Sequence, residues 1–138
     1  MKVLITGACG MIGRRLIEEL ETAGHELRLV DRVRPEAATM FNPGSPDRVA
    51  APFKTRWPFV VGEIVDPAAM DRAVQGMDAV IHLAAGVTGL PEHGVETFHL
   101  NACGTYILLD ACRKAGVKRF LCASSINAYG TIYWRLSG

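Results

Sequence analysis

Apolar residues along the chain follow two alternating patterns. Short apolar, β-branched runs predict strands, because such side chains suit a buried, pleated backbone. Five such runs occur, at residues 2–6, 26–30, 59–61, 79–83 and 117–123. Apolar residues at helical spacing predict three helices: from Met11 to a stop at Gly24, over 67–75, and over 91–115 with a stop at Gly116. This alternation predicts a parallel sheet, since each right-handed crossover returns the chain in the same direction.

The expected fold class is α/β, a doubly wound parallel sheet with strand order 3-2-1-4-5, helices on both faces, and one domain over residues 1–138. Ligands of such sheets bind beyond the carboxyl ends of the strands, where the strand order reverses between the first and fourth strands. Residues 32–57 contain four prolines, and we expect an irregular connection there with one helical turn at 35–40. Three aromatic residues predict that this connection packs against the domain: Phe41, Phe53 and Trp57.

Composition narrows the class of protein. The chain has 138 residues, a formal net charge of +1 and 49% hydrophobic residues, which is typical of a globular domain and shows no excess of positive charge for a nucleic-acid partner. No apolar run approaches the roughly 18 residues of a membrane span, so we expect no membrane partner. The four cysteines form no Cys-x-x-Cys pair, which favours buried, reduced thiols in a cytoplasmic protein and no metal site: Cys9, Cys103, Cys112 and Cys122.

Three glycines separate the first strand from the first helix in the stretch TGACGMIG, residues 6–13. Gly7 suits a sharp turn, Gly10 leaves space where the backbone approaches a pyrophosphate, and Gly13 allows close packing of the helix on the sheet. The helix then begins at Met11 and Ile12 with N–H groups that have no partner in the helix, at the positive end of its dipole. This arrangement predicts a dinucleotide phosphate site.

Asp31 ends the second strand, 18 residues after Gly13. A carboxylate at this point accepts hydrogen bonds from the ribose hydroxyls of adenosine and repels a 2'-phosphate, which favours NAD over NADP. The adjacent Arg32 keeps NADP as an alternative, because a guanidinium pairs with phosphate. Taken alone, Asp31 is also compatible with an ordinary acidic residue at a strand end.

Five stretches together resemble one family. They are TGACGMIG, VVGEIVD at 60–66, DAVIHLAAG at 78–86, HLNACGTYILLDACRKAGVKRFLCASS at 99–125, and NAYG at 127–130. The chain resembles the extended branch of the short-chain dehydrogenase/reductase superfamily, the NAD-dependent epimerase/dehydratase family. The resemblance covers essentially the whole chain and implies a Rossmann-like fold that binds NAD.

The resemblance also implies further cofactor contacts. The pair Glu63 and Ile64 matches the segment that holds the adenine ring, although the family usually has Asp at the first position. The end of the fourth strand matches the segment that lies against the ribose and pyrophosphate: Leu83, Ala84 and Ala85. Asn101 matches a helix asparagine near the cofactor, and burial of such a residue also demands hydrogen-bond partners. We interpret His82, in a buried strand, as a satisfied core residue, with a direct functional role as the alternative.

Residues after the fifth strand match the catalytic rim of the family. Ala123 and Ser124 match cofactor-proximal positions, and Ser125, four residues before Tyr129, matches the serine that hydrogen-bonds a substrate carbonyl or hydroxyl group. Without the resemblance, two serines after a strand are more typical of a turn.

The resemblance implies hydride transfer with a Tyr followed four residues later by Lys as acid and base. None of the three tyrosines has this partner: Tyr106, Tyr129 and Tyr133. We therefore expect the NAD-binding portion of a longer oxidoreductase or isomerase that acts on a sugar or sugar nucleotide, with little turnover by this chain alone. The alternative is a non-catalytic dinucleotide sensor or interaction module. The apolar edge of the last strand predicts a homo-oligomer.

Overall fold

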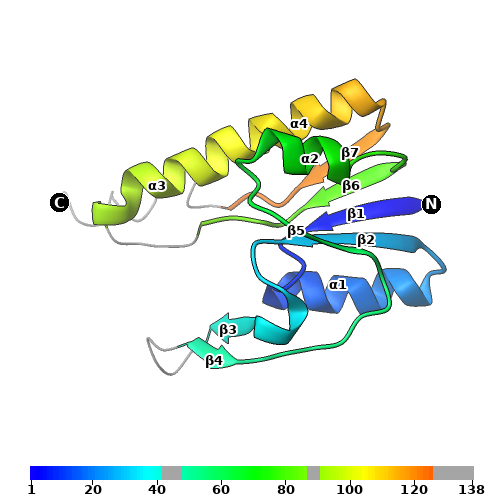
Figure 1. Ribbon diagram of the computed structural model, residues 1–138, viewed down its shortest axis with the longest axis horizontal. Helices are drawn as coiled ribbons and strands as arrows, with labels where there is room; N and C mark the ends of the chain where they lie inside the picture. Colours follow the sequence, from blue (N-terminus) through cyan, green and yellow to red (C-terminus); the bar gives the residue numbers. More distant parts are fainter. Residues whose placement is uncertain (42–47, 87–90, 126–138) are drawn as a thin grey trace.

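The protein forms one parallel sheet with helices on both faces (Figure 1). The computed structural model describes residues 1–41, 48–86 and 91–125. The strands of the sheet are β1 (Lys2–Thr6), β2 (Glu26–Asp31), β5 (Phe59–Val61), β6 (Ala79–His82) and β7 (Arg119–Cys122). They are hydrogen-bonded in the order β5-β2-β1-β6-β7. Counted within the sheet this is 3-2-1-4-5, so the predicted topology is confirmed; a small hairpin between β2 and β5 shifts the strand numbers.

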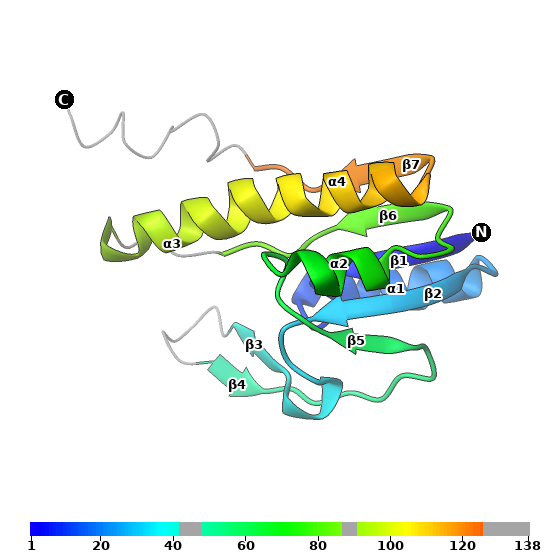
Figure 2. The same ribbon diagram turned by 45° about the horizontal axis from the view of Figure 1, so that its top comes forward.

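The two faces of the sheet are covered by different helices. Helix α1 (Met11–Thr22) packs on one face, and α2 (Pro67–Ala73) and α4 (Gly104–Ala115) pack on the other (Figure 2). Successive residues of a strand point to opposite faces. In β1, Val3 and Ile5 therefore join the core under α1, whereas Leu4 joins the core under α2 and α4.

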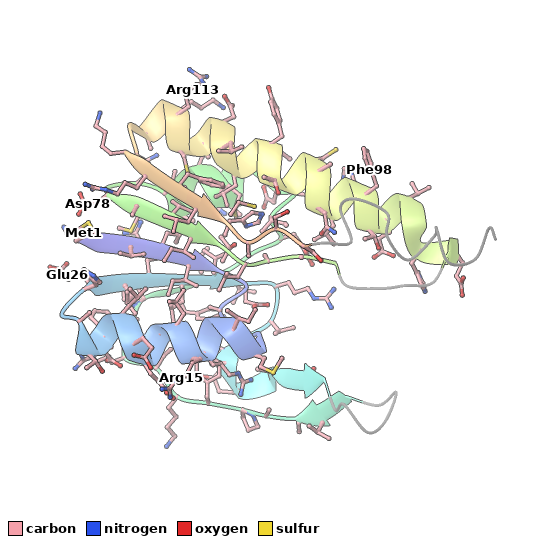
Figure 3. All side chains as sticks on the ribbon, turned by 180° about the vertical axis from the view of Figure 1, so that it is seen from behind. Met1, Arg15, Glu26, Asp78, Phe98 and Arg113 are labelled. Carbon is pink, nitrogen blue, oxygen red and sulfur yellow. The ribbon has the colours of Figure 1, made fainter. Side chains whose placement is uncertain are left out.

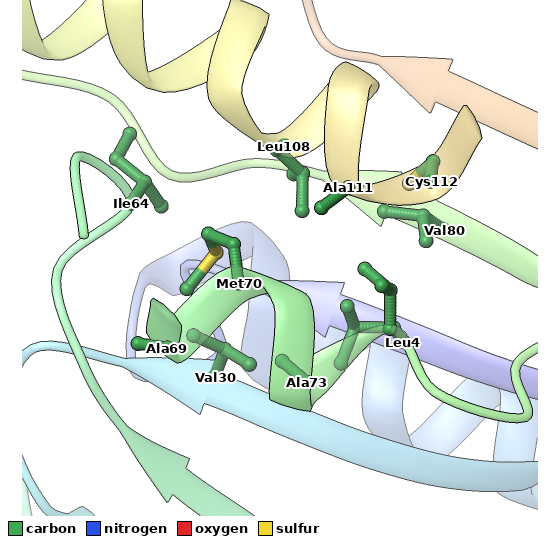
Figure 4. Close-up of a cluster of buried hydrophobic side chains, with 11 residues drawn as sticks. Leu4, Val30, Ile64, Ala69, Met70, Ala73, Val80, Leu108, Ala111 and Cys112 are labelled. Atoms are coloured by element: carbon green, nitrogen blue, oxygen red, sulfur yellow. The ribbon is translucent and has the colours of Figure 1, made fainter. Parts of the chain in front are cut away.

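The larger core lies between the sheet, α2 and α4 (Figure 4). Met70 and Leu108 are fully buried there, and each such side chain stabilises the fold by about 1.5–3 kcal/mol relative to an exposed one. Ile64 after β5 belongs to the same cluster. The core thus extends up to the edge of the sheet where the strands end.

Helix α2 begins as predicted and ends two residues earlier. Asp66 accepts hydrogen bonds from the N–H groups of Ala68 at 2.9 Å and Ala69 at 3.2 Å, which is an N-cap. At the other end, Arg28 donates to the carbonyl oxygens of Ala73 at 2.7 Å and Gln75 at 2.8 Å. The Arg28 guanidinium thus supplies these carbonyl groups with a partner from outside the helix. Because α2 ends at Ala73, the predicted extension to residue 75 is wrong.

The predicted helix over 91–115 is divided. A 3-10 turn (Pro91–His93) precedes α3 (Gly94–Phe98), and a π-helical turn, η3 (His99–Cys103), joins α3 to α4. A π-turn holds an additional residue and changes the face that the following side chains present. Hydrophobic periodicity does not reveal one inserted residue, which explains the difference. The predicted stop at Gly116 is confirmed by its left-handed conformation.

The connection after β2 is more regular than predicted. The helical turn is present as a 3-10 turn (Pro35–Ala37), but β3 (Thr39–Phe41) and β4 (Arg48–Ala50) form an antiparallel pair that the sequence analysis missed. Three-residue strands are too short to show alternation. Phe53 and Trp57 pack against the α1 core as predicted, and the side chain of Phe41 lies outside the described part.

Strand β7 forms an exposed edge of the sheet. Its residue Leu121 is 55% exposed, which agrees with the prediction of an apolar edge. Cys122 is exposed and Cys103 is half-buried, so the prediction of buried thiols holds only for Cys9 and Cys112. Across the described ranges, no helix combines the length and apolar character that crossing a bilayer requires.

Candidate functional site

The segments singled out from the sequence come together at the carboxyl edge of the sheet. All neighbouring strands are parallel, so the loops after β1, β2, β5, β6 and β7 leave the sheet at this edge (Figure 1). Met1, Glu26 and Asp78 mark the opposite, amino-terminal edge (Figure 3). The site residues therefore share one rim although they are spread over most of the chain.

Two of the glycines in the loop after β1 are required by the fold itself. Gly7 has φ +71°, and a Cβ there would lie 2.7 Å from the Ala84 nitrogen. A Cβ at Gly13 would lie 2.4 Å from the Gly7 carbonyl oxygen. Both contacts are with backbone, which cannot move aside as a side chain can. Gly7 thus brings the end of β1 against the segment after β6, and Gly13 brings α1 against the glycine loop.

Gly10 is different, because it is exposed and has an ordinary extended conformation with φ −72° and ψ 166°. A Cβ there would meet one described atom outside its chain neighbours, the Gly7 carbonyl oxygen at 3.1 Å. The described residues therefore leave open space at Gly10. A side chain would enter that space without disrupting the core.

The amino end of α1 lies beside this space and is electropositive. The first helical hydrogen bond runs from the Arg14 N–H to the Gly10 carbonyl at 3.0 Å, so the N–H groups of Met11, Ile12 and Gly13 precede it. Among the described residues no side chain caps this end, and its first turn contains no acidic residue. Met11 and Ile12 are 66% and 62% exposed. Unpaired N–H groups at the positive end of a helix dipole suit an anion.

Asp31 is joined to the glycine loop. Its Oδ2 accepts a hydrogen bond from the Cys9 N–H at 2.9 Å, and its own carbonyl oxygen accepts one from the Gly62 N–H at 3.0 Å. These contacts hold the ends of β1, β2 and β5 together. Each carboxylate oxygen accepts more than one hydrogen bond, so Asp31 retains acceptor capacity. Arg32 beside it is exposed.

Two residues that the sequence analysis did not assign to the site support the glycine loop. Arg14 donates from Nε to the Cys9 carbonyl at 3.0 Å, and its guanidinium lies 4.6 Å from the centre of the Phe53 ring. The Cys9 side chain is buried, with Sγ 3.5 Å from the Val33 carbonyl oxygen. No local sequence signal marks the contacts with Phe53 and Val33, because they join the loop to distant segments.

Cys9 provides a test of the loop. Burial, followed by the nearby Asp31 carboxylate, raises the pKa of the Cys9 thiol to about 12, and burial raises the pKa of Cys112 to about 11. The thiolate is the reactive form, so both thiols should resist iodoacetamide near pH 8 in the folded chain, whereas the exposed Cys122 should react. Peptide mass spectrometry measures the three sites, and urea should make them equally reactive. Rapid labelling of Cys9 in the folded chain would contradict the closed loop.

Asn101 clamps the segment that follows β6. Its Oδ1 accepts from the Gly86 N–H at 2.7 Å, and its Nδ2 donates to the Gly86 carbonyl at 3.1 Å. The predicted hydrogen-bond partners of this half-buried asparagine are therefore found. In this segment Leu83 and Ala84 are half-buried and Ala85 is exposed.

Glu63 and Ile64, the two residues that follow β5 and Gly62, lie in different environments. Glu63 is exposed, whereas Ile64 is 4% exposed and packs against Gly104, where a Cβ would lie 2.7 Å from its side chain. Glu63 is thus the member of the pair whose side chain faces solvent. The contact of both residues with an adenine ring stays a prediction.

Ser125 lies beyond the end of β7. The Ala123 N–H donates to the His82 carbonyl at 3.0 Å, which extends the pairing of β6 and β7 by one bond. Ala123, Ser124 and Ser125 are exposed on the same edge as the segment after β6. Tyr129, on which the assignment of Ser125 depends, lies outside the described residues.

Comparison with known proteins identifies the family. A model described as the NAD dependent epimerase/dehydratase family matches residues 3–132. The chain belongs to this family. Proteins that resemble the chain include a 3-beta-hydroxysteroid dehydrogenase from Mycolicibacterium neoaurum, 34% identical over 90% of this chain, and a UDP-glucose 4-epimerase from Bacillus subtilis, 32% identical over 94% of it.

A solved structure supports the same assignment. It is a short-chain dehydrogenase/reductase superfamily protein from Agrobacterium tumefaciens with bound NAD, 33% identical over 94% of this chain with a TM-score of 0.74. This epimerase/dehydratase-family chain spans between 32% and 38% of the length of the three proteins.

Proposed function

We propose that this chain binds NAD at the carboxyl edge of its sheet, as the cofactor-binding part of an epimerase or dehydrogenase. The observation that carries the proposal is the uncapped amino end of α1 beside the open space at Gly10. Such an end, combined with backbone that a ligand can approach closely, suits a pyrophosphate. The similar structure from Agrobacterium tumefaciens with bound NAD supports NAD as the dinucleotide.

The residues present fit this cofactor. The N–H groups of Met11, Ile12 and Gly13 would donate to the phosphates, and the spare acceptor capacity of Asp31 would take the adenosine ribose hydroxyls. When bound, NAD would supply hydride acceptance from a substrate alcohol or hydride return to a carbonyl. NADP is the second candidate because Arg32 is exposed beside Asp31.

The substrate class is a further proposal. A relative named UDP-glucose 4-epimerase favours a sugar nucleotide, and one named 3-beta-hydroxysteroid dehydrogenase makes a hydroxysteroid the alternative. In either case Ser125 would hydrogen-bond the reacting hydroxyl or carbonyl group. Four free cysteines support a cytoplasmic location, and the exposed Leu121 on the β7 edge supports self-association.

Calorimetric titration of the 138-residue chain tests cofactor binding. We expect NAD and NADH to bind, and NADP to bind about tenfold or more weakly, which corresponds to about 1.4 kcal/mol. Asp31→Asn keeps an acceptor for the Cys9 N–H and removes the charge, so it should weaken NAD binding and narrow the preference over NADP. Absence of binding for all three nucleotides at millimolar concentration would reject the proposal.

A further inference from the structure

A series of hydrogen-bonded polar groups joins β1, β6 and α4 next to the candidate site. Among the described residues, Thr6 and His82 are the buried polar ones, at 0% and 2% exposure. Thr6 Oγ1 lies 2.6 Å from His82 Nδ1, and His82 Nε2 lies 3.0 Å from Thr105 Oγ1. One imidazole therefore joins the end of β1 to the start of α4.

The contacts of Thr105 determine which ring nitrogen carries the proton. Thr105 Oγ1 lies 2.6 Å from the Asn101 carbonyl oxygen, and two oxygens at this distance need a hydrogen between them. The single hydroxyl hydrogen of Thr105 is thereby used, so His82 Nε2 must be the donor in its contact with Thr105.

The other ring nitrogen is then the acceptor of a neutral imidazole. The Thr6 hydroxyl donates to Nδ1, while Thr6 Oγ1 accepts the Ala84 N–H at 3.3 Å. The hydrogen bonds therefore all run in one direction. They lead from the Ala84 N–H through Thr6, His82 and Thr105 to the Asn101 carbonyl. Each group in this series has a partner of the correct kind.

One end of this series of hydrogen bonds lies on the segment after β6, and the other end, Asn101 in η3, contacts the same segment through its side chain. Ala84 is held at one end, and Asn101 at the other end clamps Gly86 through two hydrogen bonds. Ala84 also lies against Gly7, the first glycine of the loop. The imidazole is thus connected to residues 84–86 by two routes, through β1 and through the π-helical turn.

We propose that His82, held as the neutral Nε2–H tautomer, is a positioning residue that sets residues 84–86 against the glycine loop for the dinucleotide. The proposal rests on the proposed function for its ligand. Protonation at Nδ1 would remove the acceptor of the Thr6 hydroxyl and so disturb the route through β1, while the Nε2–H would still donate to Thr105. The nucleotide should therefore bind more weakly in acid.

The surroundings of the ring favour the neutral form. From β1 and α4 it faces the hydroxyl groups of Thr6 and Thr105, and from β7 it faces the Phe120 ring at 6.1 Å between centroids. Its sheet partner on β7 is Cys122, a thiol that contacts the Ala123 carbonyl. Burial lowers the pKa of His82 from 6.5. The neutral ring therefore stabilises the fold fully above pH 6.5, and this contribution is lost as the pH falls through the lowered value.

Nitrogen NMR of the 138-residue chain with ¹⁵N-labelled histidine tests the tautomer without any nucleotide. We expect His82, identified by the signal that disappears in His82→Gln, to carry its proton on Nε2 at about pH 7.5. A proton on Nδ1, or on both nitrogens, would overturn the proposal.

Two substitutions at Thr105 test the positioning. Thr105→Val removes the acceptor of His82 Nε2 at nearly constant volume, and Thr105→Ser keeps it. In Thr105→Val we expect the amides of Ala84 and Gly86 to exchange with solvent about tenfold faster, and the Kd for NAD to rise about tenfold. In Thr105→Ser both the exchange rates and the Kd should stay within about twofold of the parent values. The parent Kd should rise from about pH 7.5 to about pH 5.5 by a larger factor than that of His82→Gln, which has no imidazole to protonate.

The two readouts separate the two proposals. Amide exchange is measured without nucleotide, so it tests the positioning role of His82 even if the parent binds no NAD. Absence of NAD binding would reject only the proposed function. Unchanged exchange of Ala84 and Gly86 in folded Thr105→Val would overturn the positioning role. Equal pH dependence of NAD binding in the parent and in His82→Gln would also overturn it.

Discussion

Replacement of Gly10 by valine is expected to abolish NAD binding while the chain remains folded. The position has an extended backbone conformation that every residue adopts, and a Cβ would meet only the Gly7 carbonyl oxygen, at 3.1 Å, outside its chain neighbours in the described ranges. A small shift of that carbonyl accommodates the new group. The branched side chain would nevertheless fill the space proposed for the pyrophosphate. We expect a loss of at least about a hundredfold in affinity, close to 2.7 kcal/mol.

Calorimetry and circular dichroism together measure this separation of binding from folding. Gly10→Ala should show an intermediate loss of affinity, because its methyl group occupies less of the same space. Gly94→Ala is a matched control, since a Cβ at Gly94 has no described neighbour within 4 Å and the residue lies in α3, away from the loop. If Gly10→Val bound NAD as tightly as the parent, the phosphates could not lie at this loop.

Replacement of Gly13 by alanine should instead destabilise the fold, by about 3 kcal/mol or more. The added Cβ would lie 2.4 Å from the Gly7 carbonyl oxygen and 2.9 Å from the Ala8 Cα. Relief requires a movement of α1 away from the loop, and the buried Ile17 holds α1 against the sheet. Because a domain has about 5–15 kcal/mol of stability in total, this loss is a large fraction of it.

Urea unfolding followed by circular dichroism measures the second effect. The control Gly94→Ala should leave the free energy of unfolding unchanged or raise it by up to about 1 kcal/mol, because alanine is the better helix former. A midpoint for Gly13→Ala equal to that of the parent would show that the close approach of α1 to the glycine loop is absent in solution.

The parallel sheet and its strand order could be predicted because the sequence encodes them locally. Each strand is a short apolar run, each crossover contains a helix, and the right-handed rule leaves few ways to connect them. The glycine spacing before α1 and the position of Asp31 are also local, since they depend on where one strand ends and one helix begins. The candidate phosphate site could thus be located from residues 6–13 and 31 alone.

Other features could not be predicted because they depend on segments that meet only after folding. The β3–β4 pair consists of strands too short for a periodic pattern, and the π-turn adds one residue within an otherwise helical pattern. The support of the loop by Arg14 and Phe53 joins residues 39 positions apart in the chain. His82 was predicted to be a satisfied core residue, but neither its partners nor its tautomer could be inferred.

The sequence by itself determined the order of strands and helices, the side of the sheet on which its loops gather, and the bare helix start suited to a phosphate. These follow from spacing of a few residues, over which backbone geometry and side-chain pattern are directly related. Only the tertiary structure decided that Gly10, unlike Gly7 and Gly13, faces open space among the described residues, and that Thr6, His82 and Thr105 form one directed series of hydrogen bonds. Hydrogen bonding and close contact act over a few ångströms in space, and residues far apart in sequence reach that distance only when the whole sheet has formed.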